Sequence, residues 1–418
     1  MIKMVAKINP WGSSFEVHGL KRKKYMEKII PFLGSNLIKV LTGQRRSGKS
    51  HLMRSMIKHL IEYENHQPKN FLYINMELRE CAGINTPEKL FLLIDQYKKE
   101  LKPDKSWFIF IDEVQEIEHW EKALSSLIGD PNDSAQIFVS GSNANLLAGE
   151  LATYIGGRYV SFEIFPFSYT EFLEISNKSA QQSSFIEYMN FGGMPEIFHL
   201  PDEERKKHYI RNLFDSIVFR DVIKRHNIRD VWLLEQLAFL LADMVGGLFS
   251  LRKILNTLNS MGIKSNLETI GNYISFFKQA FYIHEAERYN IKGRKILSGE
   301  KKYYLNDPSF KKYLSSSFDP TPGKYLENAI FLHLKREGYD VRIGQLNTGE
   351  IDFVAFKGNE IIYVQSCYLL SSESIIEREF GNLEKIQDNY QKFVISLDFM
   401  SFGNKNGIIH LPAWEFVH

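Results

Sequence analysis

The sequence predicts a multidomain α/β fold that begins with a parallel sheet. Its 418 residues are too many for one hydrophobic core, so two or three domains are expected. Over the first 170 residues, short apolar runs alternate with amphipathic stretches, which is typical of a parallel sheet with helices on both faces. The pattern then becomes mainly helical, and it changes again after the Pro/Gly-rich segment 318–323, the best candidate for a linker.

Five apolar runs in the N-terminal part have the length and composition of buried strands. The stretches between them, such as His51–Tyr63 and Thr86–Leu101, have helical spacing. We therefore expect a domain over residues 1–170 with strands at Leu37–Leu41, Phe71–Ile74, Trp107–Ile111, Gln136–Val139 and Tyr159–Ile164.

A phosphate-binding loop is predicted where the first strand meets the first helix. The segment 43–50 matches G-x-x-x-x-G-K-[ST], and this motif needs a strand before it and a helix after it. Its glycines let backbone N–H groups surround phosphates, and the helix N-terminus adds a partial positive charge. We expect Lys49 to reach the β- and γ-phosphates of ATP and the Ser50 hydroxyl to ligate Mg²⁺. The residues expected to bind the nucleotide are Gly43, Gln44, Arg45, Arg46, Ser47, Gly48, Lys49, Ser50 and His51.

A pair of carboxylates, Asp112 and Glu113, directly follows the third apolar run. A buried strand would deliver both to the carboxyl edge of the sheet, beside the loop. We expect Asp112 to hold the Mg²⁺ and Glu113 to polarise the attacking water, so that ATP is hydrolysed and not only bound.

The fourth apolar run ends in the polar residues Ser140-Gly-Ser142-Asn143. In ATPases of this class the corresponding strand lies between the two motif strands, and its tip senses the γ-phosphate. We expect Asn143 or Ser142 to do so here, although Ser, Gly and Asn also suit a simple turn.

Arg158 follows Gly156-Gly157, where ring-forming ATPases place an arginine directed at a neighbour's γ-phosphate. A homo-oligomer is therefore expected. An ordinary surface arginine is the alternative, with Arg45 and Arg46 neutralising the phosphates instead. The residues expected to take part in hydrolysis are then Lys49, Glu113, Asn143 and Arg158.

The middle of the chain is predicted to hold a helical connector at 171–229 and a winged helix at 230–317. A helix at Leu251–Met261, a turn through Gly262 and a second helix from Asn266 have helix-turn-helix spacing, and a strand follows Phe281. Such a domain would insert its second helix into the major groove of duplex DNA. That helix carries few cations, but basic clusters lie nearby at 224–229 and 288–295. Winged helices also dock proteins, so both partners stay open.

Taken in order, these motifs resemble a family of prokaryotic AAA-like ATPases whose C-terminal half is domain of unknown function 4143. The resemblance implies an ATPase core, a winged-helix middle and a C-terminal domain similar to restriction-endonuclease-like folds. It covers nearly the whole chain and rests on the segments 42–50, 110–115, 140–143, 156–159, 191–195, 219–222, 302–307 and 350–353.

The last expected domain, 318–418, has a degenerate nuclease-like site. Nucleases of the PD-(D/E)xK type need carboxylates that hold Mg²⁺ and a lysine that activates water. Glu327, Asp352 and Gln365 occupy the carboxylate positions, but Cys367 stands where the lysine belongs. We expect no cleavage by this domain. A weak nuclease that recruits Lys357 or Lys385 is the alternative.

Net charge, cysteine content and hydropathy limit the possible functions. A net charge of +2 gives no global field for nucleic acid, and two cysteines, Cys81 and Cys367, suit a reducing compartment. No apolar run spans a membrane, no export signal is apparent and no zinc spacing occurs, so a cytoplasmic protein is expected. The predicted function is an ATP-hydrolysing protein acting on or near DNA. A partner-binding switch without DNA and an ATP-regulated nuclease are the alternatives.

Overall fold

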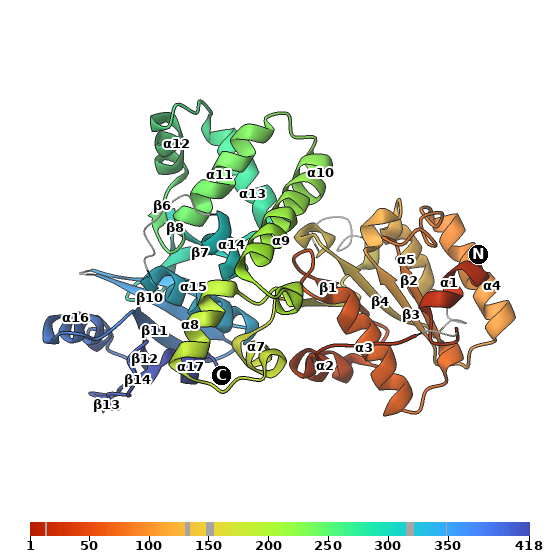
Figure 1. Ribbon diagram of the computed structural model, residues 1–418, viewed down its shortest axis with the longest axis horizontal. Helices are drawn as coiled ribbons and strands as arrows, with labels where there is room; N and C mark the ends of the chain where they lie inside the picture. Colours follow the sequence, from red (N-terminus) through yellow and green to blue (C-terminus); the bar gives the residue numbers. More distant parts are fainter. Residues whose placement is uncertain (13–14, 130–133, 148–153, 315–321, 348) are drawn as a thin grey trace. The chain divides into compact units, whose positions relative to one another are not determined.

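The computed structural model describes residues 1–12, 15–129, 134–147, 154–314, 322–347 and 349–418 (Figure 1). The chain forms two compact units, Met1–Ile164 and Phe165–His418. No helix within the described ranges combines the length and apolar character that a membrane crossing requires.

The first unit is built on a five-stranded parallel sheet in the order β2-β3-β4-β1-β5. The α/β fold with a parallel sheet is thus confirmed. Every strand lies within a residue or two of its predicted range: β1 Ile38–Thr42, β2 Phe71–Asn75, β3 Phe108–Asp112, β4 Gln136–Gly141 and β5 Tyr159–Glu163.

Helices cover both faces of this sheet because its strands are apolar on both sides. One face packs against α1 (Ile2–Val5), α4 (Pro87–Leu101) and α5 (Trp120–Gly129). The other packs against α2 (Lys23–Ile29) and α3 (Lys49–Glu62). Short 3₁₀ turns complete the unit at Ala6–Ile8, Ile30–Phe32, Pro68–Asn70, Val114–Glu116 and Ala144–Leu147.

The second unit opens with helices. Ser168 and Asp202 begin two of them by accepting hydrogen bonds from the backbone N–H of Glu171 and Arg205. A π-helical turn, Ile217–Ile223, prolongs α9. The helices are α7 Tyr169–Ser176, α8 Gln182–Phe191, α9 Glu203–Ser216, α10 Lys224–His226 and α11 Val231–Asp243, with a 3₁₀ turn at Pro195–His199.

Two helices and a β-hairpin follow, in the order of the predicted winged helix. Ser250 and Asn266 cap the two helices, α12 (Leu251–Ser260) and α13 (Leu267–Gln279). The wing consists of β6 Leu248–Phe249, β7 Ile283–Asn290 and β8 Lys295–Leu305, and α14 Pro308–Leu314 comes after it.

The C-terminal part mixes helices with strands. The expected linker at 318–321 lies outside the described residues, and Pro322 already begins α15. The elements are α15 Pro322–Arg336, β9 Asp340–Leu346, β10 Gly349–Lys357, β11 Glu360–Cys367, α16 Glu373–Glu384, β12 Gln391–Ser396, β13 Asn404–Lys405, β14 Ile408–Pro412 and α17 Ala413–Phe416.

The wing and the C-terminal strands form one nine-stranded sheet, in the order β13-β14-β12-β11-β10-β9-β7-β8-β6. The joint is a parallel pairing of β7 with β9, in which Arg288 lies opposite Ile343. One hydrophobic core also runs through both parts: the ring of Tyr304 on β8 stacks on that of Phe331 on α15 at 4.1 Å. The structure therefore divides the chain at 164/165, whereas the sequence led us to expect separate parts at 171–229, 230–317 and 318–418.

A candidate nucleotide site and a buried lysine–carboxylate cluster

The loop between β1 and α3 has a backbone that only glycine adopts easily at its two ends. Gly43 has φ 145° and Gly48 has φ 97°. A Cβ on Gly43 would lie 2.3 Å from the carbonyl oxygen of Ile164. The loop thus closes tightly at the carboxyl edge of the sheet, with the N-terminus of α3 facing the space that it encloses.

Lys49 is folded across this loop. Its side chain is buried, and its Nζ donates to the carbonyl oxygens of Gly43 at 2.9 Å and Gln44 at 3.0 Å. The same nitrogen lies 3.8 Å from Oε1 of Glu113. The ammonium group is therefore already placed between the loop and the carboxylate pair.

Asp112 lies at the end of β3 and is fully buried. It accepts hydrogen bonds from the Tyr73 hydroxyl at 2.9 Å, from Asn75 Nδ2 at 3.2 Å and from the Ser140 hydroxyl. Burial and then the neighbouring charge of Glu113 raise the pKa of Asp112, while hydrogen bonds from Ser140, Ser50 and Tyr73 act in the opposite direction.

The site fits Mg²⁺. The Ser50 hydroxyl and the Asp112 carboxylate are hard oxygen donors that hydrogen-bond to each other. Mg²⁺ usually takes only one or two protein ligands and completes its shell with water and phosphate. No cluster of three or more His, Cys, Asp or Glu suited to a metal occurs within the described ranges.

Glu113 is held in a left-handed backbone conformation, φ 55°, which is unusual for a residue with a side chain. Its backbone N–H donates to Ser140 Oγ at 3.1 Å, and Gln115 Nε2 donates to its carboxylate at 2.5 Å. Burial pushes the pKa of Glu113 upward, but the charge of Lys49 and the hydrogen bond from Gln115 outweigh burial and hold that pKa below its usual value. The carboxylate is ionised at neutral pH and can accept a proton.

The tip of β4 lies as expected, between the two motif strands. Ser142 hydrogen-bonds to the Glu113 carboxylate, and Asn143 is buried just beyond the end of the strand. Arg45, Arg46 and His51, three residues predicted to bind the nucleotide, have different surroundings. Arg45 Nη1 lies 2.5 Å from Glu77 Oε1, Arg46 is exposed, and His51 Nε2 lies 2.7 Å from the carbonyl oxygen of His18.

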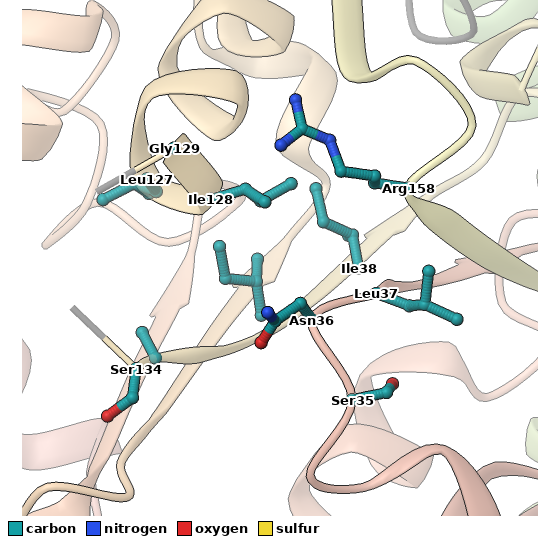
Figure 2. A pocket seen from close by; sticks show the side chains of 11 residues that line it. Ser35, Asn36, Leu37, Ile38, Leu127, Ile128, Gly129, Ser134 and Arg158 are labelled. Carbon is teal, nitrogen blue, oxygen red and sulfur yellow. The ribbon is translucent and has the colours of Figure 1, made fainter. Parts of the chain in front are cut away.

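Arg158 lies at the opposite edge of the sheet from the loop. It directly precedes β5, and β5 runs parallel to β1 with Tyr159 opposite Ile38. Five strand residues, about 16 Å, therefore separate it from the level of the loop. Figure 2 shows its side chain over a cavity of about 360 Å³ lined by the amino end of β1 and the end of α5. The structure thus keeps Arg158 away from its own nucleotide site.

A second buried polar cluster lies in the C-terminal part, around Lys302 of β8. Lys302 Nζ lies 2.9 Å from Glu327 Oε1, 2.8 Å from Glu350 Oε1 and 3.7 Å from Asp352 Oδ1. Burial alone lowers the pKa of Lys302, but the three carboxylates outweigh burial and raise that pKa.

Glu327 is the most deeply buried acid of this cluster. It also accepts a hydrogen bond from the Tyr304 hydroxyl at 2.8 Å. Burial and the charge of Asp352 raise the pKa of Glu327 to about 7, against the opposing effect of Lys302. It packs under Gly246, where a Cβ would lie 2.9 Å from its Oε2.

The remaining expected residues of the nuclease-like site are also in place. Asp352 Oδ2 accepts from the backbone N–H and the hydroxyl of Ser366, both at 2.8 Å. Gln365 Oε1 accepts from the Asp352 N–H at 3.3 Å. Cys367 occupies the lysine position of the motif, but a lysine from another strand, Lys302, reaches the carboxylates. The two lysines considered as replacements have other neighbours: Lys357 lies over the Tyr339 ring, and Lys385 binds Asn382.

Comparisons with known proteins agree with this architecture. Residues 35–173 match a family described as an AAA domain, and residues 182–321 match domain of unknown function 8612. The expected domain of unknown function 4143 was therefore the wrong family for this part of the chain. An uncharacterized protein of Haemophilus influenzae is 35% identical over 94% of this chain and 98% of its own length.

A second relative and a solved structure extend the comparison. An uncharacterized protein of Methanocaldococcus jannaschii is 31% identical over 90% of this chain and 84% of its own length. The Walker-type ATPase PABY2304 of Pyrococcus abyssi has a similar fold, with a TM-score of 0.50 and 15% identity over 72% of this chain and 99% of its own.

Proposed function

The chain belongs to the same family as these Haemophilus influenzae and Methanocaldococcus jannaschii proteins and contains an AAA domain, and on that premise we propose that it hydrolyses ATP with Mg²⁺. The observation that carries this proposal is the placement of Glu113. An ionised carboxylate, fixed by Gln115 and Ser142 beside the lysine of the phosphate loop, suits a group that takes a proton from water.

Each residue of the site has a distinct part in this proposal. The backbone of Gly43–Ser50 holds the phosphates, and Lys49 places its charge where negative charge develops during transfer. Ser50 and Asp112 would hold Mg²⁺, and the ion would supply positive charge to neutralise the phosphates. Glu113 orients the attacking water, and Asn143, just beyond β4, senses the γ-phosphate.

We also propose that the active form is a homo-oligomer. Arg158 lies at the sheet edge opposite its own loop, and in this proposal it serves a nucleotide held by another copy. A guanidinium supplied by a neighbour would make hydrolysis depend on assembly.

The second unit is proposed to act on DNA. It contains a winged helix, a fold that inserts its second helix into the major groove. A partner-binding switch is the second candidate, because α13 carries Glu268 in its first turn and only Lys278 in its last. We do not propose cleavage, because Cys367 stands where the lysine of the nuclease motif belongs.

One experiment tests these proposals together. ATP turnover by the full chain is measured with and without duplex DNA, with Glu113→Gln as the reference without a base. We expect turnover that depends on Glu113 and rises with DNA, and binding that weakens steeply with salt. Turnover equal in Glu113→Gln would refute the assignment of Glu113 as the base. Turnover without any DNA binding at low salt would leave the partner-binding switch.

A further inference from the structure

A pocket of about 550 Å³ lies where the wing meets the C-terminal strands, wholly within the second unit. Its size is in the range of pockets that hold small ligands. It is lined from several segments that are distant in the sequence. The tip of the β7–β8 hairpin and the ends of β9 and β10 form part of it, and β11 and the segment after α16 complete it.

Aromatic rings form part of the wall of this pocket: Tyr289, Phe356, Tyr363 and Tyr390. Tyr289 and Phe356 meet edge to face, with ring centroids 5.1 Å apart. Tyr390 is 40% exposed, so part of its ring remains available to a ligand. Such rings stack on any nucleobase, and each stacked base is worth about 1–3 kcal/mol.

The rim of the pocket is positively charged. Lys292, Arg294 and Lys385 line it, and all three are exposed. Asp388 is the one acidic residue among the described lining residues. Its Oδ2 accepts a hydrogen bond from the Tyr363 hydroxyl at 2.6 Å, and its Oδ1 lies 3.6 Å from Lys392 Nζ. The rim therefore favours an anionic group next to the aromatic wall.

We propose that this pocket binds one unpaired nucleotide of single-stranded DNA. The base stacks within the aromatic wall, and the flanking phosphates lie on the cations of the rim. The amides of Asn347 and Gln387, which also line the pocket, offer hydrogen bonds to base edges. The inference deepens the proposed action on DNA and rests on it: the wing that would lie against a duplex supplies Lys292 and Arg294.

The test measures binding of a fluorescein-labelled oligothymidylate of about 15 nucleotides to the full chain by anisotropy. Tyr390→Ala is expected to weaken binding about tenfold, since it removes a stacking surface. Tyr368→Ala is the matched control, because Tyr368 is also 40% exposed but does not line the pocket. Melting temperatures establish that both variants are folded.

The charge contribution is tested separately. The double variant Lys292→Glu/Lys385→Glu is expected to weaken binding and to lower the slope of log affinity against log salt by about one unit per lost phosphate contact. Lys207→Glu, exposed on α9, is expected to match the parent.

The outcomes separate this inference from the function on which it rests. If Tyr390→Ala binds as tightly as Tyr368→Ala, or the parent binds duplex but not the oligothymidylate, the pocket assignment is overturned and the ATPase proposal stands. If no DNA of either form binds, the pocket and the proposed action on DNA both fail. If turnover does not depend on Glu113, only the ATPase proposal is affected.

Discussion

Nζ of Lys302 lies 2.9 Å from Oε1 of Glu327, and both side chains are almost wholly buried. This contact joins the wing strand β8 to helix α15. Because a buried ion pair repays the loss of hydration only when both partners are present, the two residues depend on each other.

Replacing Lys302 by methionine is expected to destabilise the protein by about 3–5 kcal/mol, because it leaves buried carboxylates without a counter-charge. The free energy of unfolding in urea measures the loss. Lys301→Met is the control. Lys301 is next in the chain but half-exposed, and its ion pairs with Glu285 and Glu287 should contribute about 1 kcal/mol or less. Equal losses in the two variants would show that the cluster does not stabilise the joint.

The stability of the parent is expected to fall as pH rises from about 4.5 to about 7. Burial raises the pKa of Glu327 from 4.5 to about 7, so the folded protein keeps a proton that the unfolded chain releases over this interval. The stability that this bound proton contributes is present in full below pH 4.5 and is lost as the pH passes 7. It amounts to about 3 kcal/mol at about 1.36 kcal/mol per pKa unit. The denaturant midpoint should depend less on pH in Glu327→Gln than in the parent. An equal pH dependence in both would contradict the raised pKa of Glu327.

Lys49→Ala is expected to weaken ATP binding about tenfold to a hundredfold, because it removes a charged donor to the phosphates. Titration with a fluorescent ATP analogue in the presence of Mg²⁺ measures the change. Lys58→Ala, a half-exposed lysine on the same helix, should bind as the parent does. Parent-like affinity in Lys49→Ala would place the nucleotide elsewhere.

Glu113→Gln is expected to keep ATP affinity and to lower turnover by about 10²–10⁴-fold, since the amide cannot accept the proton. Glu116→Gln is the matched control, since Glu116 is exposed only three residues further on. Single-turnover hydrolysis beside equilibrium binding separates the two effects. A loss of affinity in Glu113→Gln would mean that this residue supports the loop and not the reaction.

Arg158→Ala is expected to leave nucleotide binding intact and to lower turnover by about 10³-fold. A mixture of Arg158→Ala with Glu113→Gln provides the sharper measurement. Each variant is inactive alone. In a mixed assembly, a subunit that keeps Glu113 lies next to a subunit that keeps Arg158, so one complete site is formed. Turnover should therefore reappear on mixing, and its absence would argue against an arginine acting between copies.

Local patterns were sufficient to predict the first unit. Its strands are continuous apolar runs, and its phosphate loop is a contiguous motif, so neither required knowledge of distant contacts. The partners of Asp112 were not predictable in this way. Tyr73 and Asn75 come from β2, and only the strand order places them beside β3.

The sequence alone did not reveal the role of Lys302 for the same reason. It is 25 residues from Glu327 and 50 from Asp352, and the pairing of β7 with β9 that brings them together has no local signature. One signal was available: Lys302 directly precedes the apolar and aromatic residues Tyr303-Tyr304-Leu305, and a lysine in the buried part of a strand needs a partner.

The parallel joint between β7 and β9 limits where the chain can be cut. Removing residues after 321 would expose the hydrogen-bonding edge of β7 together with the apolar surface that α15 covers. A free strand edge of this kind recruits other chains, so a truncated winged helix should aggregate instead of remaining monodisperse. Expression boundaries for this protein therefore belong near residue 165, and not at the Pro/Gly-rich segment that the sequence suggests.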